Sequence, residues 1–127
     1  MTKGFSSVEL RRVLEERSGI TWGVEQESQT PVPGALPVLT VTNVQETLRT
    51  EPMLYLRGVT ARDRERKAAQ KDWTIAVGSN GNRDRIGNCV FIEKDTEYLF
   101  ASFLVAFRPK PDSKIYPEYF FRWMSSY

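Results

Sequence analysis

The sequence contains no histidine and only one cysteine, Cys89. It therefore lacks the most frequent general base of enzymes, and a single cysteine excludes both an internal disulfide and an ordinary structural zinc site. The first residues contain no apolar segment of the kind found in secretory signals. Together with the unpaired cysteine, this predicts a cytoplasmic protein.

Long apolar runs and nucleotide-binding motifs are also missing. No stretch approaches the roughly 18 apolar residues that predict a membrane-spanning helix. The glycine-rich segment around residues 78–87 lacks the Gly-Lys-Ser/Thr ending of a P-loop, and no Gly-x-Ser-x-Gly nucleophile motif occurs. Carboxylates such as Asp63 and Glu65 follow no catalytic spacing. We therefore predict one domain over residues 1–127, with no membrane segment, no catalytic residues, no metal and no cofactor.

The charge is nearly balanced overall but unevenly distributed. The formal net charge is +2, and the first 51 residues carry five basic and seven acidic side chains. The remaining residues carry thirteen basic and nine acidic side chains. Local basic patches of this kind can bind a phosphate backbone. By charge alone, however, a set of solvated surfaces is the favoured interpretation.

Three helices are predicted from capping signals and spacing. Ser6 and Glu9 form a capping-box pattern that predicts a short helix over about residues 7–17. Thr60 is a candidate N-cap for a charged helix extending to Lys71. Pro117 is well placed as the first residue of a final helix. The apolar stripe of that helix would consist of Tyr116, Phe120, Phe121 and Met124.

Strands are predicted where β-branched and aromatic residues cluster or alternate with polar ones. These segments cover residues 20–24, 37–44, 53–56, 73–77, 89–92 and 100–107. Core packing is the favoured role of most aromatic residues. This expectation covers Trp73, Phe91, Phe100, Phe103, Phe107, Tyr116, Phe120, Phe121 and Trp123, with Cys89 as a small core residue.

The polar, glycine-rich segment between the fourth and fifth predicted strands is the first candidate binding site. Its glycines would allow close approach to phosphates, and asparagine and arginine side chains suit the edges of adenine and guanine. The candidate residues are Ser79, Asn80, Asn82, Arg83 and Arg85. An ordinary hairpin connection with solvated arginines is an equally good interpretation.

Two other segments offer polar groups. The charged stretch 57–71 contains five candidate phosphate contacts, namely Arg57, Arg62, Arg64, Arg66 and Lys67. The favoured alternative is a solvated helix with ion pairs between successive turns. The loop over residues 26–34 contributes Ser28, Gln29 and Thr30 as possible contacts to bases or phosphates, with a flexible connector as the alternative.

The order of these motifs resembles the target recognition domain of type I restriction-modification specificity subunits. The likeness runs over about residues 20–126, through "PVLTVTNV", "KDWTIAVGSNGNRDRIGNCVFI", "LFASFLVAFRPKP" and "IYPEYFFRWMSS". Thr42-Asn43-Val44 matches a recurring element at the end of a strand. Ser79-Asn80-Gly81 matches a Ser-x-Gly loop. Trp73 departs from the pattern, because a small or aliphatic residue is usual there.

The resemblance implies an α+β fold, with a twisted and largely antiparallel sheet flanked by short helices. It implies a sequence-specific, non-catalytic DNA-binding domain that reads one half of a bipartite site in double-stranded DNA. Separate methyltransferase (modification) and restriction subunits would be its partners. Met1 and the short first helix favour the N-terminal of two such domains. The lack of a coiled-coil spacer helix indicates an isolated domain, a truncated piece or a half-subunit. The alternative is a protein-interaction or restriction-regulating module with the same fold that does not read DNA.

Overall fold

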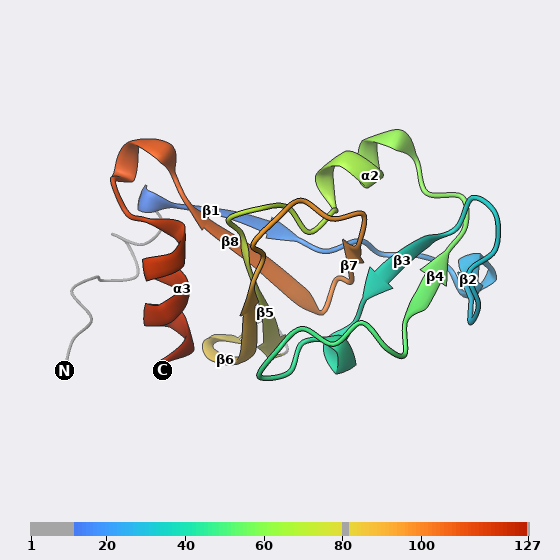
Figure 1. Ribbon diagram of the computed structural model, residues 1–127, viewed down its shortest axis with the longest axis horizontal. Coiled ribbons are helices and arrows are strands. Elements are labelled where there is room, and N and C mark those ends of the chain that lie inside the picture. The colour runs from blue at the N-terminus through green and yellow to red at the C-terminus, as the bar shows by residue number, and fades with distance from the viewer. Residues whose placement is uncertain (1–11, 80–81, 127) are drawn as a thin grey trace.

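The computed structural model describes residues 12–79 and 82–126, which form two four-stranded sheets with short helices beside them (Figure 1). The first sheet has the order β1-β8-β5-β6, and every neighbouring pair in it is antiparallel. Its strands are β1 (Leu14–Ser18), β5 (Thr74–Ser79), β6 (Asn82–Phe91) and β8 (Leu104–Pro109).

The second sheet has the order β2-β4-β3-β7, and its β3–β7 pair is parallel. Its strands are β2 (Glu27–Ser28), β3 (Leu36–Leu39), β4 (Leu54–Leu56) and β7 (Leu99–Phe100). The helical elements are η1 (Val24–Gln26), η2 (Val41–Asn43), α2 (Ala61–Arg66), η3 (Pro111–Ser113) and α3 (Pro117–Ser125). The predicted α+β class with largely antiparallel pairing is therefore confirmed, although the strands divide into two sheets.

Buried side chains connect the two sheets. Leu39 and Val44, from the segment containing β3, pack in one cluster with Ile75, Leu104 and Ala106 of the first sheet. Because side chains alternate along a strand, the neighbouring residues of the first sheet point to its other face. There a second cluster combines Ala76, Cys89 and Phe107 with Phe120 and Met124 of α3. The first sheet is thus covered on both faces.

Within the described residues, the helix predicted over 7–17 is confirmed only at residues 12 and 13, which are helical, and it is wrong over residues 14–17. Residues 14–18 form β1, which pairs with β8 from Leu14↔Pro109 to Ser18↔Val105. Residues 7–11 of the prediction lie outside the described residues. The helical spacing of leucine and valine gives only a weak local preference for a helix. Pairing with β8 outweighs this preference, because it satisfies the backbone hydrogen-bonding groups at the edge of the sheet.

The predicted strand over 100–107 is interrupted. β7 ends at Phe100 and β8 begins at Leu104, and the two strands belong to different sheets. Between them the amide of Leu104 donates to the carbonyl of Ala101 at 2.8 Å, which closes a tight turn. This turn exposes Phe103, which is therefore not a core residue. Tyr116 is also exposed and does not join the apolar stripe of α3.

Several predicted elements are confirmed with different bounds. Thr60 caps α2, because its hydroxyl accepts a hydrogen bond from the amide of Asp63 at 3.1 Å, but the helix ends at Arg66 rather than Lys71. Pro117 is the first residue of α3. The strand predicted over 37–44 ends at Leu39 and continues into η2. The strand predicted over 20–24 is reduced to a single bridge from Ile20 to Ala101.

Trp73, the residue that departs from the family pattern, is buried between two arginines. The guanidinium carbons of Arg17 and Arg108 each lie 4.7 Å from the centroid of its ring. Arg108 also forms an ion pair of 2.8 Å with Glu15. The large indole therefore has a structural role, because it provides an aromatic face for two cations at the edge of the first sheet.

Candidate nucleic-acid interface

The glycine-rich candidate segment is part of a long β-hairpin rather than a loop between strands. β5 reaches Ser79 and β6 starts at Asn82, so the two strands extend into the predicted excursion, where Gly78 pairs with Ile86 and Ser79 with Asn82. The register changes from Gly78↔Ile86 to Ser79↔Asn82. Residues 83–85 therefore form a bulge on β6 that has no counterpart on β5, and such bulges often occur beside functional sites.

Four of the five candidate residues of this segment are placed, by the course of their backbone. Ser79 ends β5, whereas Asn82, Arg83 and Arg85 lie in the first part of β6. Asn80 lies outside the described residues. Both arginines belong to the bulge at residues 83–85, on a two-stranded ribbon. A ribbon of this kind is narrow enough to enter the major groove of DNA.

The turn between β7 and β8 lies directly beside the end of this hairpin, where β5 turns into β6. The amide of Gly78 donates to the carbonyl of Phe103 at 3.2 Å, and Val77 pairs with Leu104 across the strands. The side chain of Phe103 is 72% exposed, whereas Phe100 and Leu104 are buried. The turn thus presents one large aromatic ring to solvent next to the candidate segment. Sequence reasoning missed this, because Phe103 lies within a continuous apolar run.

A buried asparagine organises the neighbouring element η2. The side-chain oxygen of Asn43 accepts hydrogen bonds from the amide and hydroxyl of Thr40 at 2.9 and 3.1 Å. Its side-chain nitrogen donates to the carbonyls of Arg49 and Pro52 at 2.8 and 2.9 Å. The Thr42-Asn43-Val44 element is therefore structural, since Asn43 and Val44 are both 1% exposed.

We call the hairpin ends at Gly78, Ser79 and Asn82, the turn 101–103 and η2 together the hairpin edge. Backbone hydrogen bonds hold these pieces together, because the amide of Ala101 donates to the carbonyl of Leu39 at 2.9 Å. In Figure 1 the hairpin, the turn and η2 lie along the lower side of the molecule.

The candidate cations of α2 and its C-cap form a second region, which we call the α2 edge. Arg64 pairs with Glu97 at 3.2 Å, and Lys67 donates from its ammonium to the carbonyl of Ser18 at 2.8 Å. The side chains of Arg62 and Arg66 make no hydrogen bond or ion pair with another described residue, and both residues are exposed. Two of the four cations are thus already bound within the protein.

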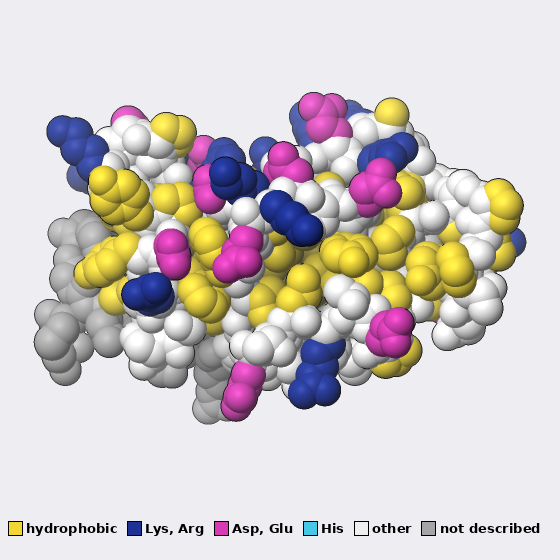
Figure 2. Space-filling model, in the orientation of Figure 1, with side chains coloured by type: hydrophobic (Ala, Val, Ile, Leu, Met, Phe, Trp, Pro, Cys, Tyr) yellow, Lys and Arg dark blue, Asp and Glu magenta, His cyan; other side chains and the backbone are white. Residues whose placement is uncertain are grey.

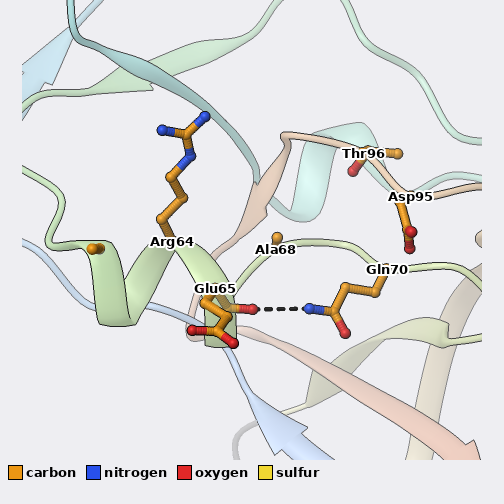
Figure 3. Close-up of a pocket in the computed structure, with 7 residues that line it drawn as sticks. Arg64, Glu65, Ala68, Gln70, Asp95 and Thr96 are labelled. Carbon is orange, nitrogen blue, oxygen red and sulfur yellow. Dashed lines mark hydrogen bonds between the residues drawn. The ribbon is translucent and has the colours of Figure 1, made fainter.

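A shallow hollow separates α2 from the segment before β7, and it is lined by residues of both charge signs (Figure 3). Its polar groups have partners within the chain. Gln70 donates from its amide to the carbonyl of Glu65 at 2.9 Å, and Asp95 accepts from the amide of Lys71 at 2.9 Å. The hollow therefore does not present a set of unoccupied groups of one charge that would suit an anion.

The remaining candidates lie near η1 and β2. The guanidinium of Arg57 donates to the carbonyl of Glu25 at 2.8 Å, which connects the end of β4 to η1. The hydroxyl of Ser28 donates to the carbonyl of Thr30 at 2.7 Å in a local turn, and Gln29 and Thr30 are exposed. β2 lies at the right end of Figure 1.

The three groups of predicted residues therefore do not form one continuous surface. In Figure 1, α2 lies on the upper side, the hairpin on the lower side and β2 at the right end. Figure 2 shows basic and acidic side chains interspersed on the visible face, with hydrophobic side chains through its middle. No large region of one charge covers this face, so the position of a nucleic acid must be argued from local groups.

The described residues provide few groups for catalysis. Burial raises the pKa of the Cys89 thiol above its ordinary value, because the thiolate would lose its hydration, and this disfavours the nucleophilic form. Within residues 12–79 and 82–126, no three cysteine or carboxylate side chains gather so that they could hold a metal ion. No helix of this part of the chain is long and apolar enough to cross a bilayer.

Comparison with known proteins shows a shared fold. No protein-family model matches the sequence, and no curated protein matches it significantly. Among solved structures, a chain from a study of complex assembly and conformational transition in the type I R-M system matches with a TM-score of 0.60 and 12% identity. The match covers 91% of this chain but only 26% of that chain. The described fold is thus that of one part of a type I restriction-modification component.

Proposed function

We propose that this chain is a target recognition domain of a type I restriction-modification specificity subunit and reads one half of a bipartite DNA site. The observation that carries this proposal is the fold likeness, which extends over 91% of the chain. The motif order along the sequence supports the same assignment independently. Methylation and cleavage would be performed by the partner modification and restriction subunits, so this domain itself needs no catalytic residues.

The reading surface in this proposal is the hairpin edge. A two-stranded ribbon fits the major groove, and Arg83 and Arg85 are of the type that recognises guanine through two hydrogen bonds. Ser79, Asn80 and Asn82 would add neutral contacts to bases or phosphates. Arg83 and Arg85 belong to the bulge at residues 83–85, and a bulge bends its strand and can re-aim the side chains that it carries.

The α2 edge has a smaller part in this proposal. In Figure 1 the hairpin edge lies on the lower side and α2 on the upper side, so a straight duplex bound to the hairpin edge would be separated from α2 by the sheets. Arg57, Arg64 and Lys67 already hold parts of the chain together. We therefore propose that Arg57, Arg62, Arg64, Arg66 and Lys67 contribute general attraction to DNA rather than the principal phosphate contacts. Ser28, Gln29 and Thr30 would be peripheral to the duplex, because β2 lies at the right end of Figure 1 rather than along its lower side.

Titration of fluorescent duplex DNA with the chain at several salt concentrations tests the proposal. Arg83 and Arg85 would each bring one positive charge close to the phosphates of the groove, and two such charges predict a loss of affinity of about tenfold between about 50 and 200 mM salt. Arg83→Ala and Arg85→Ala should each weaken binding to a selected site by about tenfold, as loss of one bidentate base contact does.

Arg122→Ala is the matched control, because Arg122 is an exposed arginine on α3 paired with Glu118 at 3.3 Å. It should leave DNA affinity unchanged. Binding to modification subunits with no affinity for duplex DNA would replace the proposal with the protein-interaction alternative.

A further inference from the structure

The turn between β7 and β8 holds an exposed aromatic ring on a rigid backbone. The amides of Ala101 and Ser102 donate to the carbonyls of Leu39 and Ile20 at 2.9 and 3.0 Å. The carbonyl of Phe103 accepts from Gly78 at 3.2 Å. Three separate segments therefore fix the turn. The strands on either side of it end in Phe100 and Leu104, which are each 1% exposed.

The exposure of Phe103 has no structural explanation within the described residues. A phenyl ring that is 72% exposed forgoes most of the free energy that its burial would provide. Its side chain takes part in none of the three core clusters, and the backbone of the turn, not the ring, makes the hydrogen bonds. An exposed ring on a backbone held in this way is typical of a contact residue, because only the rotamer freedom of its side chain is lost when it binds.

The position of the ring indicates what it contacts. The carbonyl of Phe103 accepts a hydrogen bond from Gly78, the second-last residue of β5, so the turn lies beside the end of the β5–β6 ribbon. If the end of the ribbon enters the major groove, an exposed ring beside it comes within reach of base edges in the same groove. The apolar feature there is the C5-methyl group of thymine, and phenylalanine is among the side chains that contact it.

Building on the proposed function, we infer that Phe103 is a specificity-determining residue that packs against a thymine methyl group in the major groove. Burial of one methyl group corresponds to about a fourfold preference for thymine over a base pair without that group. The arginines of the hairpin would read hydrogen-bonding groups, and Phe103 would add an apolar contact beside them.

The experiment starts with sites selected by the wild-type chain from a random pool of duplexes. Each thymine of a selected site is replaced in turn by uracil, which removes only the methyl group. At one position the wild-type chain should bind the uracil duplex about fourfold more weakly. Phe103→Ala should bind the thymine and uracil duplexes equally, whereas Phe103→Leu should retain part of the difference.

Tyr116→Ala is the matched control, because Tyr116 is also an exposed aromatic, 79% accessible, but precedes α3. It should keep the full fourfold difference. The inference is overturned if no uracil substitution affects the wild-type chain, or if Phe103→Ala shows the same fourfold loss. With either outcome, salt-dependent binding of the wild-type chain to the duplex pool would still support the proposed function. Absence of any such binding would remove the proposed function and this inference together.

Discussion

The hairpin edge and the α2 edge differ in how their polar groups are used. At the α2 edge, two candidate cations, the exposed Arg64 and the half-buried Lys67, are held by acceptors of the same chain. At the hairpin edge, the buried Asn43 and several backbone amides fix the scaffold through hydrogen bonds, while Phe103 stays exposed. Under the proposed function, density of positive charge would therefore indicate the reading surface less well than a rigid backbone that carries an exposed aromatic side chain.

Asn43→Asp should produce the largest effect and tests whether the hairpin edge depends on its buried scaffold. The substitution keeps the shape but removes the donor to the carbonyls of Arg49 and Pro52. Loss of two partly buried hydrogen bonds, which leaves both carbonyls without this donor, should lower the free energy of unfolding by about 2 kcal/mol. Urea denaturation followed by tryptophan fluorescence measures this, with the exposed Thr42→Val as control. A change below about 0.5 kcal/mol would show that the edge is held by other contacts.

Lys67→Met should have an intermediate effect on stability and little on target choice. Its ammonium connects the end of α2 to the carbonyl of Ser18 in β1, and methionine retains the apolar stem without the donor. We expect a loss of about 1 kcal/mol in the free energy of unfolding. Arg64→Ala is the comparison, because an exposed pair such as Arg64–Glu97 contributes about 0.5 kcal/mol or less. Equal losses of unfolding free energy for Lys67→Met and Arg64→Ala would contradict a stabilising role for the hydrogen bond from Lys67 to Ser18.

Arg62→Ala should have the smallest effect on stability and DNA affinity, and it tests most directly whether the α2 edge contacts DNA as the hairpin edge would. Arg62 is exposed and its side chain has no partner among the described residues, so the substitution should not alter stability. If α2 does not contact the duplex, the slope of log affinity against log salt should change by less than about 0.5. Arg83→Ala should change that slope by about 0.9. A change of about 0.9 for Arg62→Ala would place phosphate contacts at the α2 edge.

Local sequence signals predicted several elements correctly. Thr60 as N-cap, Pro117 at the start of α3 and the antiparallel pairing of β5 with β6 each follow from neighbouring residues. These signals are reliable because capping and alternation depend on groups within a few positions. The motif order that resembled a target recognition domain also led to the fold that the structural comparison supports.

The errors occurred where a distant segment decides the outcome. Residues 14–18 have helical spacing, yet β8 offers them a strand partner more than 80 positions away. The apolar run around Phe103 appears continuous, although it divides between two sheets at a turn. For both segments, pairing energy between strands outweighs local preference, and no nearby residue signals it.

The sequence by itself determined that the chain has no histidine and cannot form an internal disulfide, where its final helix begins and that Trp73 and Cys89 are core residues. Composition and local spacing suffice for these conclusions, because they depend on side-chain type and immediate neighbours. Only the tertiary structure decided that the candidate cations are divided between separate edges and that Phe103 is exposed on a fixed turn. Those properties arise from strand pairing between distant segments, which sets the position of a side chain independently of its local pattern.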